Sequence, residues 1–470
     1  MSADAQKTVV QVLARFAASV RRDGLPPELR VDVARRVLDL VGNAVAAHGE
    51  PAAGSVRRVV QSWGGHETAT VIGSPGRVPA SAAALVNGTL AHSMDFDDTH
   101  LPSVLHPSSP VIPAALATAE AHDPAGSLVL DAAGVGIEVA VRLGMGGYDQ
   151  ELGNSVFFER GQHATSICGA VGASVASAMI LGLDSEGIAH AAGIAASMGA
   201  GLLEANRTGG TVKRVHCGWA AHAGVVAAEL AREGMTGPPT VIEGRFGFLY
   251  AFCGDRADVP AVVDRLGEHW ELPGIFFKPY PCNHFTHAGI DAALRLKGQG
   301  IDPQGISTLE LGVPTPVLRT IAEPVDEKAR PRSGYHAAFS GPYTVAAALM
   351  GGGGLGVGHE DFTDAAAEDS ARLSLAAKVR CVGDPRCDEI FPMQFPAVLR
   401  AVMADGSRHE VRVDVNRGGP GNPLTPEELS RKFRSNAKAL LSDDAAAQVV
   451  DAVFALPDGG TVDVLMALLR

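Results

Sequence analysis

Apolar residues recur every three or four positions along most of the chain up to about residue 270, which is the spacing of one helix face. The stretch 29–44 carries such a stripe directly after Pro26-Pro27, and proline suits the first turn of a helix. Similar patterns rich in Ala, Val and Leu occupy residues 81–90, 128–143, 163–181, 185–197 and 217–232. Strand-like runs are few here, with 68–72 as a candidate for a short hairpin element. This part is therefore predicted to be helical.

The pattern changes from about residue 272, where apolar and polar positions alternate as they do in strands. Two such runs flank Ala404-Asp405-Gly406-Ser407, and an Asp-Gly pair between strands predicts a hairpin. The predicted strands are 307–313, 378–382, 395–403 and 408–415, and the predicted helices between them are 287–297 and 340–350. The end of the chain returns to helix after Thr425-Pro426-Glu427-Glu428, a capped helix start.

We therefore predict a mainly α fold in which a large all-helical domain is built from both chain ends. Its two parts are residues 1–271 and 418–470, and a smaller α+β domain, residues 272–417, is inserted between them.

The composition of the chain narrows the classes of function. Its 470 residues are 46% hydrophobic and 19% charged, as expected for a globular protein with a large core. The net charge of −13 argues against nucleic acid as a partner. Six cysteines without CxxC spacing predict neither a disulfide framework nor a structural metal centre. The N-terminus lacks a signal-peptide pattern and no long apolar run is present, so we expect a cytoplasmic protein.

The segment 92–113 concentrates groups that can do chemistry between two predicted helices. Its titratable and hydroxyl side chains include His92, Asp95, Asp97, Asp98, Thr99, His100 and His106. Burying unpaired charge is costly, so packing alone is a poor reason for such a cluster. Two other interpretations stay open: helix termination by exposed acidic residues, and a site for a hard cation.

Five further residues, in four segments of the chain, are candidates. His163 precedes an apolar helix, where it is either a cap or a group that faces a substrate. Lys213 and His216 lie at a helix start, where a cation is unfavourable unless it binds an anion. Lys278 stands among aromatic and proline residues, and partial desolvation would strengthen its hold on an anion. Tyr343, near the start of an Ala-rich helix, is either core or site.

Two motifs resemble the signatures of the 2-methylcitrate dehydratase/cis-aconitate decarboxylase family (MmgE/PrpD). They are MDFDDTH followed by HPSSP within residues 94–110, and KPYPCNHFTHAGIDAAL at residues 278–294. The resemblance runs through nearly the whole chain, and it implies a helical core, an α+β lid, an active site in the cleft between them and a homodimer formed by the helical domain.

The resemblance also assigns roles to individual residues. It implies active-site positions for Asp95, Thr99, His106, for His163 in a GxHxTS stretch, for Lys213 in a KxxH stretch, for Lys278 and for Tyr343. We predict catalytic roles for His106, Asp95, His163, Lys213 and Lys278. We predict substrate-binding roles for Thr99, His100, His216 and Tyr343.

This mixture of lysines, histidines, a carboxylate and hydroxyls suits a small substrate that carries two or three carboxylates. The lysines would hold the carboxylates, and a histidine or aspartate would move a proton α to one of them. We therefore predict a lyase that needs no metal or organic cofactor and dehydrates a small hydroxy-polycarboxylate. The alternatives are decarboxylation of a cis-aconitate-like acid, epimerisation of an amino-dicarboxylate, and an inactive helical binding protein.

Overall fold

The structure, a computed structural model, describes residues 7–470 apart from the side chain of Arg207. The described chain forms two compact units, one of residues 7–275 and 436–470 and the other of residues 276–435. Helices dominate the described chain and the strands are few, so the prediction of a mainly α fold with a small α+β part is confirmed. No helix among the described residues is both long and apolar enough to cross a membrane.

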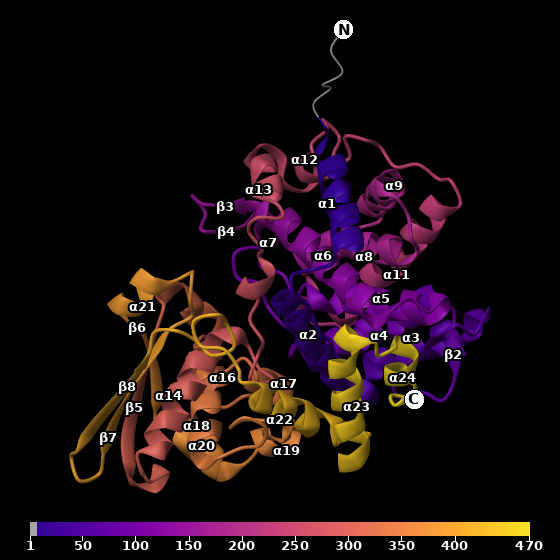
Figure 1. The fold of residues 1–470 in the computed structure, drawn as a ribbon. Helices are drawn as coiled ribbons and strands as arrows, with labels where there is room; N and C mark the ends of the chain where they lie inside the picture. Colours follow the sequence, from indigo (N-terminus) through magenta and orange to yellow (C-terminus); the bar gives the residue numbers. More distant parts are fainter. Residues whose placement is uncertain (1–6) are drawn as a thin grey trace. The chain divides into compact units, whose positions relative to one another are not determined.

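The first unit is helical (Figure 1). Its helices are α1 (Val9–Asp23), α2 (Pro27–Ala46), α3 (Pro51–Trp63), α4 (Ala80–His92), α5 (Ser108–His122), α6 (Gly126–Met145), α7 (Val156–Glu159), α8 (Ala164–Ile180), α9 (Ser185–Ala196), α10 (Ala205–Thr208), α11 (His216–Arg232), α12 (Phe248–Cys253), α13 (Val259–Val263), α23 (Asp443–Ala455) and α24 (Val462–Ala467). Two short antiparallel pairs accompany them: β1 (Ala69–Thr70) with β2 (Arg77–Val78), and β3 (Tyr148–Asp149) with β4 (Asn154–Ser155).

The centre of this unit is a group of helices that approach one another closely. Helix α8 is buried along its whole length and packs against α5, α6, α9 and α11, while α4 packs against α5 and α11. Glycines make this possible. A Cβ on Gly218 of α11 would lie 2.1 Å from the carbonyl oxygen of Leu85, and a Cβ on Gly88 of α4 would lie 2.8 Å from the Cα of Gly218. Small side chains therefore set the spacing of α4 and α11, which both carry site residues.

The second unit contains a four-stranded sheet with the strand order β6-β5-β7-β8. Its strands are β5 (Ile306–Val313), β6 (Val379–Gly383), β7 (Ala397–Met403) and β8 (Arg408–Val413), of which β5 and β6 are parallel and the other neighbours antiparallel. Its helices are α14 (His287–Gly298), α15 (Leu318–Ile321), α16 (Val325–Ala329), α17 (Gly334–Ala337), α18 (Gly341–Met350), α19 (Asp364–Ala367), α20 (Ser370–Ala376), α21 (Pro385–Ile390) and the first part of α22 (Pro426–Ala437).

The two faces of this sheet differ in chemistry. Helices α14 and α18 cover the apolar face, where Leu311 and Leu399 are buried. On the other face, Arg380, Glu310, Arg400 and Glu410 form a row of ion pairs across β6, β5, β7 and β8. Because opposite charges alternate from one strand to the next, each charged side chain has an oppositely charged neighbour without being buried.

The second unit extends to Ser435, whereas the sequence analysis ends the inserted domain at residue 417. Backbone and side-chain contacts hold the intervening residues to the second unit: the Phe277 amide donates to the carbonyl of Gly418, and Arg417 pairs with Glu428. The predicted capped start of α22 is confirmed, because the Glu428 amide donates to the hydroxyl of Thr425.

We predict that Gly218→Ala destabilises the helical unit. The added methyl group would meet the backbone of α4, so the helices must separate, at a cost of about 1–3 kcal/mol for an overpacked core. Gly54→Ala is the matched control, since a Cβ there meets only the flexible end of Arg58 and alanine favours helix. Thermal melting measures both. A G218A protein that melts at the wild-type temperature would contradict the close crossing of α4 and α11.

Candidate active site

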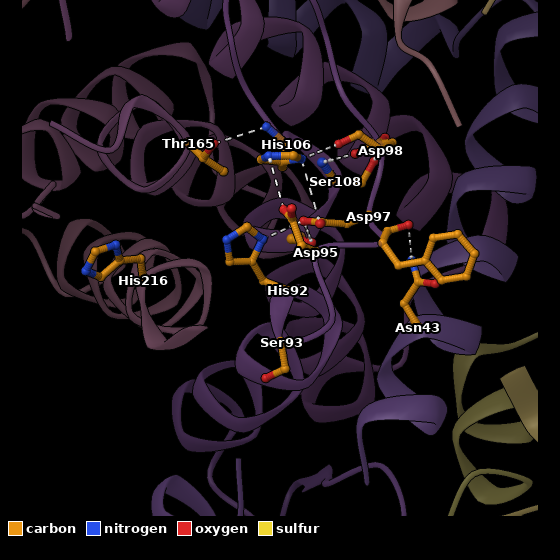
Figure 2. Close-up of polar contacts among 12 residues, drawn as sticks. Asn43, His92, Ser93, Asp95, Asp97, Asp98, His106, Ser108, Thr165 and His216 are labelled. Atoms are coloured by element: carbon orange, nitrogen blue, oxygen red, sulfur yellow. Dashed lines mark hydrogen bonds and ion pairs between the residues drawn. The ribbon is translucent and has the colours of Figure 1, made fainter. Parts of the chain in front are cut away.

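The loop between α4 and α5 folds around two buried aspartates (Figure 2). Asp97 accepts a hydrogen bond from the Ser109 hydroxyl at 2.6 Å, and Asp98 accepts one from the Ser108 hydroxyl at 2.6 Å. Asp95 stands in the left-handed region with φ 51°, which turns the chain after α4.

A buried ion pair balances the charge of Asp98. The guanidinium of Arg36, on α2, donates to Asp98 at 3.0 Å and is 1% exposed. The same group donates to the carbonyls of Leu272 and Ile275. Burial raises the pKa of Asp98 above its ordinary value, while the positive charge of Arg36 and the bonds from Ser108 oppose that rise.

The hydrogen bonds of His106 define where its ring exchanges protons. Its Nδ1 lies 2.8 Å from the backbone carbonyl of Asp98, and a carbonyl can only accept, so Nδ1 carries the hydrogen. In the neutral ring the basic nitrogen is therefore Nε2. The backbone amide of His106 donates to the hydroxyl of Thr165 on α8, which fixes the ring's position from a second helix.

Asp95 lies between two groups that can be positively charged. One of its oxygens is 3.9 Å from His106 Nε2 and 3.8 Å from the ammonium of Lys213, which lies on the 3₁₀ turn Val212–Val215. All three side chains are partly exposed, between 17% and 25%. The structure thus brings together His106, Asp95 and Lys213 at a partly open position, as a reactive centre requires.

His163 and His216 form a second pair of site residues. His163 precedes α8 and His216 begins α11, and their Nδ1 atoms are 3.0 Å apart. Such a contact holds one hydrogen, so at most one of the two rings can be an imidazolium while it persists. Burial, with the nearby positive charges of His92 and Lys213 acting in the same direction, lowers the pKa of His216 to about 4. Burial likewise lowers the pKa of His163 well below its ordinary value.

The remaining predicted site residues have different surroundings. Thr99 is beside His106, at 3.4 Å from Nδ1. His100 is buried and bonds to Ser103 at 2.8 Å, with Glu271 3.6 Å away, so it supports the loop.

Lys278 and Tyr343 belong to the second unit, where both side chains are buried. The hydroxyl of Tyr343 donates to the backbone carbonyl of Asp361 at 2.7 Å, and Phe362 packs on its ring. These contacts agree with the alternative that Tyr343 is a core residue.

Sequence reasoning missed two groups that organise the site. Arg36 and His92 received no role, although Arg36 lies seven residues after Leu29 on the apolar stripe of α2. A charged residue on a buried helix face was the available signal, since such a group must find a partner inside the protein.

Two groups of side chains have the spacing of metal ligands among the described residues. They are Asp95, Asp97 and His106, and His92, Asp97 and Cys217, with ligand atoms within 4.8 Å of one another in each group. Burial raises the pKa of Cys217 well above its ordinary value, which keeps the metal-free thiol protonated. The first group already has the ammonium of Lys213 next to Asp95.

Comparison with known proteins identifies the family. Residues 11–259 match the MmgE/PrpD N-terminal domain, and residues 280–456 match the MmgE/PrpD C-terminal domain. The chain therefore belongs to the MmgE/PrpD family, as its motifs predicted, and the prediction of an enzyme of the lyase class is confirmed.

Named relatives align along most of the chain. Cis-aconitate decarboxylase of Homo sapiens is 32% identical over 413 residues, covering 86% of this chain and 82% of that protein. Cis-aconitate decarboxylase-like protein oryM of Aspergillus oryzae is 27% identical and covers 94% of both chains. Cis-aconitate decarboxylase of Aspergillus terreus is 26% identical and covers 99% of this chain and 97% of that one.

We predict that Arg36→Met destabilises the helical unit by about 3–5 kcal/mol, because it leaves the carboxylate of Asp98 buried without its cation. Adding Asp98→Asn removes the uncompensated charge, so the double variant should recover part of the loss. Arg22→Ala serves as control, because the Arg22–Asp23 pair is exposed, and it should change little. Chemical denaturation measures all three. Additive effects of the two substitutions would show that Arg36 and Asp98 are not coupled.

Proposed function

We propose that this chain is a lyase of small polycarboxylates that works without a cofactor, with decarboxylation of a cis-aconitate-like acid as its leading reaction. The observation that carries the proposal is the arrangement of His106, whose Nδ1 is committed to a backbone carbonyl while Nε2 is next to Asp95. The names of the relatives favour decarboxylation over the dehydration that the sequence analysis puts first.

We assign a separate role in the reaction to each of these residues of the helical unit. Lys213 supplies a partly exposed ammonium group, which attracts a substrate carboxylate. Asp95 and Asp97 lie 3.9 and 3.7 Å from the ring nitrogens of His106, and these charges stabilise the imidazolium form. His106 is then the proton donor through Nε2, and neutral His163 is the proton acceptor. We assign to Lys278 of the second unit the binding of another carboxylate.

In the leading reaction, the carboxyl group that will leave must first be ionised. Where it is protonated, neutral His163 takes its proton. The bond between that carboxylate and the carbon skeleton breaks, and carbon dioxide departs. The bonding electron pair stays on the skeleton, where the adjacent double bond shifts to accept it, and the ammonium groups stabilise the negative charge. His106 delivers the proton that completes the new C–H bond.

Dehydration is the second candidate, because the same two histidines supply the base and the acid that it needs. Neutral His163 would remove the proton α to a carboxylate, and His106 would protonate the departing hydroxyl group, which leaves as water. A homodimer, a cytoplasmic location and a lid role for the second unit remain predictions that rest on the family resemblance and the sequence.

We predict that substitutions of the proposed proton donor and of the proposed carboxylate-binding lysines have different kinetic effects. His106→Ala should lower kcat by roughly 10²–10⁴-fold, as expected when a general acid is lost, with little change in KM. Lys213→Ala and Lys278→Ala should mainly raise KM, because an ammonium group binds carboxylates in the ground state as well. His66→Ala and Lys438→Ala are controls at exposed positions.

The assay follows carbon dioxide release and ultraviolet absorbance in parallel, over a panel of citrate-like, aconitate-like and dicarboxylate compounds. Carbon dioxide release with an aconitate-like acid supports the leading reaction, while new conjugated double bonds without gas support dehydration. A folded H106A protein with near-normal kcat would contradict the assigned proton donor. Turnover of no compound in the panel would contradict the substrate class.

We also predict that exhaustive chelation leaves activity unchanged, because Lys213 already provides a cation at Asp95. Activity is compared after dialysis with and without a chelator, followed by addition of single divalent ions. Loss on chelation and recovery with one ion would instead make Asp95, Asp97 and His106 a metal site.

A further inference from the structure

Four histidine rings lie in a row inside the helical unit. Neighbouring ring centroids are 5.3 Å apart for His106 and His92, 5.4 Å for His92 and His163, and 5.1 Å for His163 and His216. The reaction proposed above uses the rings on both sides of His92 but gives His92 no part. This ring is 3% exposed and ends helix α4.

A buried carboxylate sets His92 apart from the other rings (Figure 2). Its Nδ1 lies 2.7 Å from Oδ2 of Asp97, which is fully buried. A carboxylate accepts, so the ring donates, and a second ring proton would make the contact an ion pair. His106 is placed differently, since its Nδ1 donates to the carbonyl of Asp98 and is 3.7 Å from Asp97.

The far half of the row has the opposite character. His163 and His216 share one hydrogen between their Nδ1 atoms, and neither ring forms an ion pair with a carboxylate among the described residues. Burial is the first cause that lowers the pKa of both rings, and positive charge on His92 and on Lys213 adds to it.

The charged and titratable groups around the row come from several elements. They are Asp95, Asp97, Asp98 and His106 of the loop, Lys213 of the 3₁₀ turn, His163 before α8, and His216 and Cys217 of α11. Of these groups, Asp97 is in hydrogen-bond contact with the ring of His92.

We propose that His92 is a positioning residue of the reaction: bonded to Asp97, it carries a positive charge next to His163 and thereby keeps His163 neutral and able to accept a proton. The effect on catalysis rests on the proposed function, whereas the placement of the charge does not. A positive ring 5.4 Å from His163 opposes a second positive charge there.

The test uses His92→Asn, because the asparagine amide can replace the Nδ1–H donor to Asp97 but cannot be charged. Removing a positive neighbour removes one cause that lowers the pKa of His163 and His216, so both rings should gain protons at a higher pH. In protein labelled with ¹³C and ¹⁵N at histidine, the His216 signal should titrate near pH 4 in the wild type and about one unit higher in H92N. His66→Asn, at an exposed position, should leave it unchanged.

The second measurement is the pH profile of kcat/KM. Activity that needs neutral His163 is lost as the pH falls through the pKa of that ring, so the acid limb should move to higher pH in H92N. A merely structural role would lower activity without moving the limb.

The outcomes separate the inference from the proposed function. Unchanged histidine titration in H92N overturns the placement of the charge, whatever the reaction is. A shifted titration with an unmoved acid limb overturns the assigned role of His163, and with it the action of His92 on catalysis. If H92N does not fold, the wild-type spectra decide: His163 and His216 gaining protons at the pH of an ordinary histidine would contradict the inference.

Discussion

The burial of two consecutive carboxylates organises the helical unit. Asp97 and Asp98 lie inside a core built mostly of Ala, Val, Leu and Gly, where an uncompensated charge is far more costly than at the surface. Each one therefore needs its own hydrogen-bond donors, and these come from different helices: Arg36 of α2 and Ser108 of α5 for Asp98, and His92 of α4 and Ser109 of α5 for Asp97. Satisfying the two aspartates ties the end of α4 and the start of α5 to the middle of α2.

The partly exposed groups take their positions from this buried framework. His106 follows the two aspartates in the same loop, and its ring is held by the carbonyl of Asp98 and its backbone by Thr165. Asp95 precedes them at the turn after α4, where it meets Lys213. The charges of this region thus fall into two groups: those that are buried and hydrogen-bonded, and those that are partly exposed and within reach of a ligand. The buried charges hold the partly exposed ones rigidly in place without destabilising the core.

The sequence predicted the helices and strands well where the periodicity was long, as in 29–44, which became α2, and in the hairpin around Asp405-Gly406. It also located the loop 95–106 as chemically unusual. What it could not give was the partner of each charge, because Arg36 and Asp98 are 62 positions apart and meet only after packing. Nor could it give the contacts of the buried His100 with Ser103 and Glu271, and the substrate-binding role of His100 stays a prediction.

The several contacts of Arg36 have a consequence for how the helical unit opens. One guanidinium binds Asp98 of the site loop and also the carbonyls of Leu272 and Ile275, the last residues before the chain enters the second unit. If either segment moves away, the Arg36 side chain that also holds the other segment is disturbed. The loop and the exit segment should therefore behave as one cooperative unit of local unfolding, with amide protons that become exchangeable together rather than in turn.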